Sequence, residues 1–190
     1  MKLTKEFYLN EDVVGVAKSL IGKILYTNFG GITAAMITET EAYAGITDKA
    51  SHAYNNKKTK RTSPMFKEGG ISYVYLCYGI HSLFNVVTNA EDIPHAILIR
   101  AISPTEGLDI MKTRTNKVKV NSSTFNGPGK VSKALGIKVK HSDINLEGKE
   151  IWIEDNGIII PDSDIQIGPR IGIDYAEEDA KLPYRFLYTR

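Results

Sequence analysis

Apolar and polar positions alternate along the chain in short runs, and these predict a sheet protein with few helices. The runs are rich in Val, Ile, Thr and Tyr and are bounded by Gly, Asn or Pro, which is typical of strands. Between the first two runs, Phe29-Gly30-Gly31 predicts a hairpin turn. Strands are predicted at residues 23–28, 33–43, 71–78, 83–88, 96–101, 151–153, 158–160, 171–173 and 186–188.

Three helices are predicted from their start and stop residues. The first follows the N-cap Asn10-Glu11-Asp12 and ends at Gly22. The second opens at Ser103-Pro104-Thr105-Glu106, a capping box, and runs to Thr113, and the third spans 127–135. Residues 44–70 and 115–125 are polar and predict long loops.

No internal repeat and no linker divides these elements, so residues 1–190 are expected to form one domain. Strand pairs joined by short turns, with helices between some of them, favour an α+β fold. We therefore expect a mostly antiparallel, curved β-sheet with a few peripheral helices.

Two carboxylates inside an apolar strand are the most unusual feature of the pattern. A strand repeats every two residues, so Glu39, Glu41 and Tyr43 share one face. Acids and a phenol side by side cost free energy if they are buried without partners. The face is therefore either an ordinary solvated surface or a functional site, and spacing alone does not separate the two.

Composition narrows the class of protein. The chain has one cysteine, Cys77, which forbids an internal disulfide and a multi-cysteine zinc site. No apolar run reaches the ~18 residues of a membrane span, and residues 1–6 lack the apolar core of a signal peptide. We expect a cytoplasmic protein without a membrane partner. We also expect a monomer, because no apolar interface is indicated.

Charge is distributed unevenly. Residues 1–140 carry 19 Lys and Arg against 11 Asp and Glu, whereas residues 141–190 carry 5 against 11. Twelve of the basic residues form three clusters, which are Lys57/Lys58/Lys60/Arg61, Lys112/Arg114/Lys117/Lys119 and Lys130/Lys133/Lys138/Lys140. Clusters of this kind indicate either a polyanion-binding face or solvated surface.

Further polar and aromatic side chains sit where a site would need them. Asn85 and Arg100 lie in apolar strands, so each is either a structural partner or a ligand-reading group. Tyr75 and Tyr78 precede Gly79 and are either core aromatics or rings that stack on a planar ligand. Walker, Gly-x-Ser-x-Gly and His-Glu-x-x-His motifs are absent, and we predict no metal site and no cofactor.

In chain order, these motifs resemble the alkyladenine (3-methyladenine) DNA glycosylases over nearly the whole sequence. The segments that carry the resemblance are Glu39-Thr40-Glu41-Ala42-Tyr43, His52, Thr59-Lys60-Arg61, Met65-Phe66, residues 73–81, Asn85-Val86-Val87, Leu98-Ile99-Arg100-Ala101, Asn126-Gly127-Pro128-Gly129-Lys130 and Arg170-Ile171-Gly172-Ile173.

The resemblance implies a monofunctional base-excision repair enzyme that uses no metal or other cofactor. Such an enzyme binds double-stranded DNA, flips out an alkylated or deaminated purine and hydrolyses its N-glycosidic bond. By position, Glu41 resembles the base that activates water, and Arg100 the neighbour that helps to place it. The other roles implied are base-pocket walls for Tyr43, His52, Tyr75 and Asn85, an intercalating wedge for Tyr78, and DNA-backbone contacts for Thr59, Arg61, Met65 and Lys130.

Two positions depart from the family pattern. Thr62 follows Arg61 where the family more often has Asn, and Gly69 stands where a Pro is usual. Both lie in the region expected to contact DNA, so they bear on loop rigidity and affinity and leave the reaction unaffected.

Two other classes of function compete with this interpretation. A carbohydrate glycosidase would use Glu39 and Glu41 as its acid pair, but it leaves the basic clusters unexplained. A non-enzymatic nucleic-acid-binding module would explain the tyrosines and cations, but it gives no role to Glu41 beside Arg100.

Overall fold

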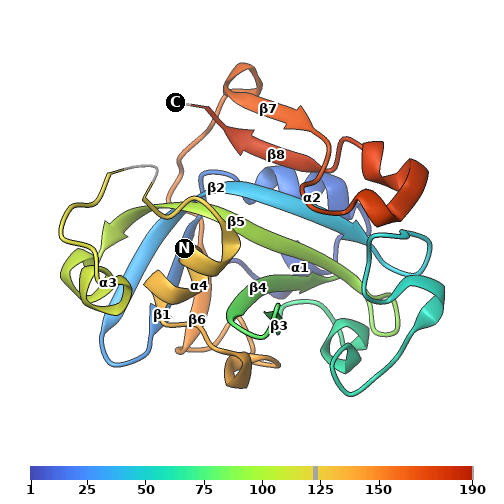
Figure 1. Ribbon diagram of the computed structural model, residues 1–190, viewed down its shortest axis with the longest axis horizontal. Helices are drawn as coiled ribbons and strands as arrows, with labels where there is room; N and C mark the ends of the chain where they lie inside the picture. The colour runs from blue at the N-terminus through green and yellow to red at the C-terminus, as the bar shows by residue number, and fades with distance from the viewer. Residues whose placement is uncertain (122–123, 190) are drawn as a thin grey trace.

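Two long antiparallel strands form the centre of the molecule. The computed structural model describes residues 1–121 and 124–189. In it, β2 (Ile32–Ala44) pairs with β5 (His95–Glu106) along almost its full length, as Figure 1 shows. The other strands are β1 (Ile24–Asn28), β3 (Ser72–Cys77), β4 (His81–Thr88), β6 (Ile151–Glu154), β7 (Ile165–Gly168) and β8 (Arg185–Tyr188).

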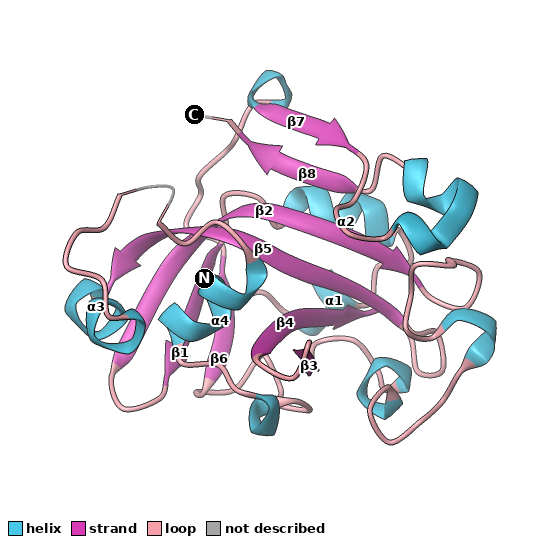
Figure 2. Ribbon diagram, viewed as in Figure 1, coloured by secondary structure: helices cyan, strands magenta, loops and turns pink. Residues whose placement is uncertain are grey.

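Within the described residues, eight strands form one antiparallel sheet. Six of them follow the order β3-β4-β5-β2-β1-β6, and β8 pairs both with β2 and with β7. Short helices surround it (Figure 2). The α-helices are α1 (Lys5–Tyr8), α2 (Val13–Ser19), α3 (Leu108–Thr115) and α4 (Pro128–Leu135). The α+β, mostly antiparallel fold predicted from the sequence is confirmed.

Alternation along the strands separates a core face from a second face. Ala42, Phe84 and Ile97 point into the main core, where residues of α1, α2 and α4 also pack. Thr40 belongs to this side, because its hydroxyl donates to the carbonyl of Ala17 in α2. By strand periodicity, the odd-numbered positions 39, 41 and 43 of β2 face the other way.

The centre of β2 is bordered by a strand on each side at these positions. Glu39 pairs with Ala101 of β5 and with Leu187 of β8, and the β2–β5 register shifts between Ile37 and Thr40. Such irregularities re-aim side chains locally. The carboxylates of Glu39 and Glu41 therefore arise from the interior of the sheet and not from an edge.

Several local predictions hold. Asp12 is the N-cap of α2 and accepts a hydrogen bond of 2.9 Å from the Gly15 amide. The turn at residues 29–31 joins β1 to β2, and α4 ends at Gly136. The loop at 44–70 contains two 3₁₀ turns, Tyr54–Asn56 and Ser63–Phe66. Part of the loop predicted at 115–125, residues 122–123, lies outside the described residues.

The helix predicted from the capping box at Ser103 is wrong. Ser103 and Pro104 continue β5 and pair with Met36 and Ala35 of β2. The ladder with β2 prevails over the local cap, and α3 begins only after Gly107, whose φ of +71° ends the strand.

The strands predicted at 158–160 and 171–173 are also wrong. Ile159 is 89% exposed, and Gly172 has a φ of +75°, which breaks an extended run. Their β-branched residues gave the pattern of strands, but neither segment pairs with another strand in the described chain. None of the helices in the described residues is long and apolar enough to cross a bilayer.

Candidate active site

Glu41 is the most buried charged group of the second face. Its side chain has no exposed surface, and four donors surround its carboxylate. Oε1 accepts a hydrogen bond of 2.8 Å from the Ile171 amide, and Oε2 accepts one of 2.9 Å from the Tyr43 hydroxyl. Arg100 approaches both oxygens at 3.4 Å, which is long for a charged hydrogen bond.

Burial dominates the electrostatics of Glu41. Loss of solvent raises the pKa of its carboxyl above the ordinary value, although Arg100, the Ile171 amide and the Tyr43 hydroxyl each act to lower that pKa. A raised pKa makes a carboxylate a stronger base. Glu41 thus has the environment of a group that takes up protons.

Glu39 shares the guanidinium of Arg100 with Glu41. Its Oε1 accepts hydrogen bonds of 3.3 Å from Arg100 Nε and 2.9 Å from Arg185. The two carboxylates therefore lie side by side on one cation. An acid pair that cleaves a sugar chain would instead face each other across the bond, so this geometry disfavours the carbohydrate glycosidase.

A cavity of about 390 Å³ opens in front of Arg100 and Tyr43. The cavity is lined by all four residues predicted as walls of a base pocket, Tyr43, His52, Tyr75 and Asn85. Tyr78, which is predicted to act as the wedge, lines it as well. Other lining residues are Met65, Tyr73, Cys77, Leu98, Ile171, Ile173 and Tyr175. Glu41 itself lies behind this wall.

Three of the rings that line the cavity contact one another. His52 meets Tyr75 edge to face, with centroids 4.5 Å apart, and Tyr73 stacks on Tyr75 at 5.6 Å. The Nδ1 atom of His52 also shares a hydrogen bond of 2.9 Å with the Tyr73 hydroxyl. Burial, and secondarily the charges of Arg61 and Lys57, lower the pKa of His52 to about 4. The imidazole is therefore neutral near pH 7.

The side chain of Asn85 is held by β3 and by its own strand, β4. Its Nδ2 donates to the carbonyls of Tyr73, at 3.1 Å, and Leu83, at 3.3 Å. The side chain is 3% exposed and lines the cavity. The structure thus gives Asn85 a bridging role between strands as well as a place in the wall.

Arg170 supports the candidate site, although its sequence motif predicted no role for it. It is buried and pairs with Asp48, while its guanidinium stacks over the rings of Tyr43 and Tyr184 at 4.8 and 5.2 Å. The next residue, Ile171, supplies the amide that binds Glu41. A charge adjacent to the run 171–173 was the available indication, just as Arg100 directly follows the apolar run 97–99.

Tyr78 stands at the tip of the β3–β4 hairpin. It is 92% exposed, and its φ of +50°, followed by +73° at Gly79, is typical of a tight hairpin turn. Neighbouring Leu76 and Ile80 are 47% and 73% exposed. The hairpin therefore presents an apolar tip at the mouth of the cavity, with Tyr78 foremost.

Residues predicted to contact the DNA backbone fall into two groups. Thr59, Arg61 and Lys130 are exposed, and in the described chain neither Arg61 nor Lys130 forms an ion pair. The prediction for Met65 needs correction, because its side chain is 1% exposed and packs with Phe66, Tyr73 and Val87. Met65 lines the cavity wall, since its apolar side chain closes the core beneath the loop.

The two departures from the family pattern have local reasons. Thr62 is buried, and its hydroxyl accepts from the Thr59 amide at 2.8 Å and donates to the Lys57 carbonyl, which ties the loop together. Gly69 donates its amide to the Asn89 carbonyl at 2.8 Å. A proline has no such donor.

Comparison with known proteins decides the family. Residues 6–190 match the methylpurine-DNA glycosylase family. The chain belongs to this family. The resemblance found in the sequence is confirmed, as is the prediction of an enzyme that hydrolyses N-glycosyl bonds.

Curated relatives agree over nearly the full chain. A protein of Chlamydia felis is 49% identical over 187 residues, covering 97% of this chain and 95% of its own. Proteins of Clostridium perfringens strain 13 and Bacillus cytotoxicus are 43% and 40% identical, and each alignment covers at least 95% of both chains. Each is named "Putative 3-methyladenine DNA glycosylase".

The charged groups of the candidate site are paired with one another or with neighbouring donors. Across residues 1–121 and 124–189, no three His, Cys, Asp or Glu side chains gather as a metal site would require. The roles of the individual site residues remain predictions, and their placement around one cavity supports them.

Proposed function

We propose that this glycosylase acts as a monofunctional base-excision repair enzyme. It would flip alkylated or deaminated purines, of the 3-methyladenine, 7-methylguanine, hypoxanthine and ethenoadenine class, out of double-stranded DNA. It would then hydrolyse the N-glycosidic bond and leave an abasic site. The proposal includes action as a monomer on chromosomal DNA in the cytoplasm, without a cofactor.

One observation carries the proposal: a buried carboxylate with a raised pKa lies directly behind an aromatic cavity whose rim bears an exposed tyrosine. A base inside a duplex can be reached only after extrusion, which costs a few kcal/mol of unstacking. Tyr78 would fill the vacated stack and offset part of that cost. The cavity volume of about 390 Å³ suits one planar base.

The cavity wall favours bases with a positive charge. Tyr43, Tyr73 and Tyr75 line it, and His52 is neutral near pH 7. Alkylation at a ring nitrogen makes a purine cationic, so the rings attract it by cation–π interaction. A protonated histidine at the same place would repel it.

In the proposed hydrolysis, Glu41 acts as the general base. Glu41 takes a proton from a water molecule, whose oxygen bonds to C1′ of deoxyribose as the bond from C1′ to the purine nitrogen breaks. A cationic alkylpurine takes the bonding electron pair and leaves as a neutral base, whereas a neutral purine such as hypoxanthine leaves as an anion and takes up a proton from water. The sugar passes through an oxocarbenium-like state, which the carboxylate stabilises.

Room for the water comes from the weaker contacts of Glu41. The hydrogen bonds from Ile171 and Tyr43, at 2.8 and 2.9 Å, fix the carboxylate in place. The two contacts with Arg100 at 3.4 Å are long and are the ones that a water molecule would replace. Arg100 then remains beside the water and orients it, while Glu39 and Arg185 hold the surrounding charges in place.

The test uses duplexes that each carry a single damaged purine. The protein is incubated with hypoxanthine, ethenoadenine or alkylated purine duplexes, and abasic sites are then cleaved with alkali. Strand cleavage at the lesion, absent from undamaged and uracil-containing duplexes, is the expected result. Binding without cleavage of any purine lesion would instead support the non-enzymatic module.

A further inference from the structure

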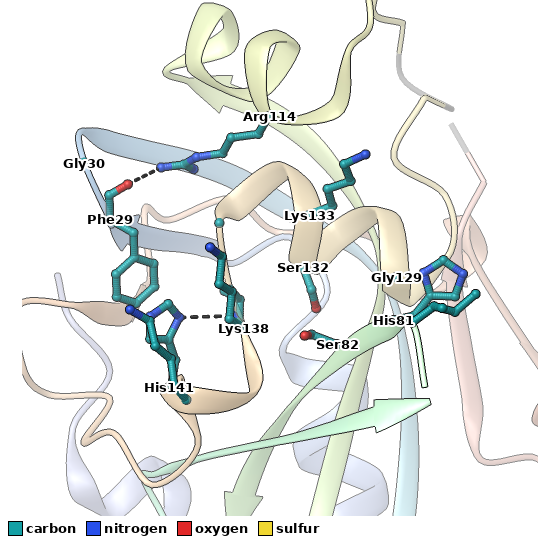
Figure 3. A pocket seen from close by; sticks show the side chains of 14 residues that line it. Phe29, Gly30, His81, Ser82, Arg114, Gly129, Ser132, Lys133, Lys138 and His141 are labelled. Carbon is teal, nitrogen blue, oxygen red and sulfur yellow. Dashed lines mark hydrogen bonds between the residues drawn. The ribbon is translucent and has the colours of Figure 1, made fainter. Parts of the chain in front are cut away.

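A second and larger cavity lies apart from the candidate active site. It measures about 700 Å³ and is bordered by the turn after β1, the start of β4, α4 and the 3₁₀ turn Val139–His141. Figure 3 shows Arg114, Lys133 and Lys138 around it, with His81 at one end. Its lining contains six basic or imidazole side chains and no Asp or Glu: Arg114, Lys133, Lys138, Lys140, His81 and His141.

The β3–β4 hairpin separates this basic cavity from the base pocket. Ser82 of β4 lines the basic cavity, whereas Leu83 and Asn85 line the base pocket. Because successive side chains of a strand point to opposite faces, the two cavities lie on opposite sides of β4. Helix α4 divides them in the same way, with Pro128 at the base pocket and Gly129 at the basic cavity.

The cations of this cavity are not neutralised by carboxylates. Lys133, Lys138 and Lys140 are exposed and form no ion pair within the described chain, whereas Lys58 and Lys67 are each paired with an aspartate. Clustered charges without counter-ions destabilise a fold by mutual repulsion, and an anionic ligand removes that cost.

Arg114 adds a fourth uncompensated charge. Its guanidinium is half-buried, and among the described residues it donates only to neutral oxygens, those of Phe29, Thr33 and Ala134. It is thereby held rigidly in the wall, where its charge reaches the cavity without a counter-ion among the described residues.

The walls keep the cavity open and supply hydrogen-bond donors. A Cβ atom at Gly136 would lie 2.8 Å from the Arg114 guanidinium, and one at Gly129 would lie 3.0 Å from the His81 ring. His141 stacks on Phe29 at 3.8 Å and closes one side. The buried Ser132 hydroxyl has no hydrogen-bond partner in the described chain, and it points toward Ser82 in Figure 3.

A smaller cavity of about 230 Å³ links this region to the predicted DNA surface. It shares His81, Gly129 and Lys133 with the basic cavity and adds Lys117 and Lys130. The positive surface therefore runs from Lys130 past the hairpin. A continuous row of cations fits a phosphodiester chain better than a single small anion.

We propose that the basic cavity binds backbone phosphates of the duplex on the side of Tyr78 that faces away from the base pocket. The proposal rests on the proposed function, because that function places Tyr78 in the DNA. The duplex would then be held on both flanks of the wedge, which keeps the unstacked step centred on Tyr78. The ligand class is the phosphodiester backbone, irrespective of base sequence.

The salt dependence of binding to undamaged and hypoxanthine-containing duplexes tests this proposal. Each phosphate contact contributes ~0.9 to the slope of log affinity against log salt concentration. The triple variant Lys133→Gln/Lys138→Gln/Lys140→Gln should lose at least one such unit on both duplexes. The variant with Arg at all three positions should keep the native slope. Lys149→Gln/Lys181→Gln is the matched control, since both residues are exposed, unpaired in the described chain and outside these cavities.

A second measurement uses the one-sided position of the cavity. Two duplexes of equal length each carry the same single lesion. It lies near one end in the first duplex and near the opposite end in the second. The native protein should bind one of them more tightly, and the Gln triple variant should lose that preference. An unchanged slope together with an unchanged preference would overturn the proposal.

Inorganic phosphate separates a DNA site from a small-anion site. Two results together would overturn the proposal: shifts of the His141 imidazole resonances on addition of inorganic phosphate, and a native salt slope in the Gln triple variant. They would mean that the cavity binds a free anion and not the DNA backbone. Failure of the native protein to excise any purine would refute the proposed reaction instead, and the slope difference on undamaged DNA would still be measurable.

Discussion

Asp48 and Arg170 form a buried ion pair behind the base pocket. Both terminal nitrogens of Arg170 donate to the Asp48 carboxylate, with one bond at 2.9 Å, across 122 positions of the chain. Arg170 also donates to the Ala42 carbonyl at 2.9 Å, and Asp48 accepts from the Ala44 amide. The pair therefore clamps the end of β2 to the loop that delivers the Ile171 amide to Glu41.

Replacing Asp48 by Asn should leave the buried Arg170 charge unpaired and lower the free energy of unfolding by ~3–5 kcal/mol. Urea denaturation followed by fluorescence measures the change. Lys49→Gln is a neighbouring control, because Lys49 pairs with Glu177 and Glu178 at the exposed surface and its loss should change stability far less. Equal effects of the two variants would contradict the clamp.

Replacing Glu41 by Gln keeps the shape of the side chain but removes the proposed general base. Excision should fall by two or more orders of magnitude, roughly the span of general-base catalysis, while binding to lesion DNA survives. Single-turnover excision and an equilibrium binding assay measure the two quantities. Turnover near the native rate would transfer the role to Glu39.

The stability of the fold should depend on pH through the protonation of the His52 imidazole. Its pKa in the fold, about 4, lies below the ordinary 6.5. The unfolded chain therefore binds the extra proton first as pH falls, and the stability that neutral His52 contributes is present above pH 6.5 and lost between about 6.5 and 4. An imidazole titration by NMR should place its midpoint near 4, and a midpoint near 6.5 would contradict burial as the cause.

Asn85 is expected to exclude guanine by a clash with its exocyclic amine. Asn85→Ser shortens the side chain and keeps a polar group, so the variant should gain activity on guanine-containing mispairs while keeping much of its activity on hypoxanthine. Excision assays on both duplexes measure this.

A purely structural Asn85 would behave differently. Loss of its hydrogen bonds to Tyr73 and Leu83 would cost ~1–3 kcal/mol and lower every activity through stability. The melting temperature is therefore measured alongside excision. A large fall in melting temperature without new guanine activity would refute exclusion by a clash.

Gly69 is expected to be required by packing. A Cβ atom there would lie 2.6 Å from the Tyr8 carbonyl oxygen and 3.0 Å from Thr88 Cα, both backbone atoms that cannot move aside. Gly69→Ala should therefore lower the free energy of unfolding by ~1–3 kcal/mol. Gly168→Ala is the control, because its Cβ would meet only the end of the Arg185 side chain, at 3.9 Å. Equal stability of the two variants would contradict the packing argument.

Local periodicity was enough to predict which side chains lie together at the centre of the candidate site, and the family resemblance supplied their predicted roles. The two-residue repeat placed Glu39, Glu41 and Tyr43 on one face, and Tyr43 and Glu41 are hydrogen-bonded in the structure. The charge at the end of an apolar strand identified Arg100, which contacts both carboxylates. These residues could be found because each belongs to a strand whose pattern is visible within a few positions.

Features that depend on distant partners could not be predicted in this way. Asp48 and Arg170 lie in irregular segments, and nothing near either residue indicates the other. The capping box at Ser103 predicted a helix, but this segment pairs with β2, which lies more than 60 positions earlier in the chain. Burial of Met65 likewise depends on Tyr73 and Val87, which only the folded sheet brings beneath its loop.

The backbone at Tyr78 adopts a left-handed conformation that a tyrosine seldom takes, with a φ of +50°. Folding of the β3–β4 hairpin therefore meets that conformational cost before any DNA is present. Under the proposed function, the ring is already raised when the protein encounters a duplex, so its insertion orders little more than two side-chain torsions. Preorganisation of this kind lowers the entropic penalty of each trial insertion, and an enzyme that must test many undamaged base pairs benefits at every one of them.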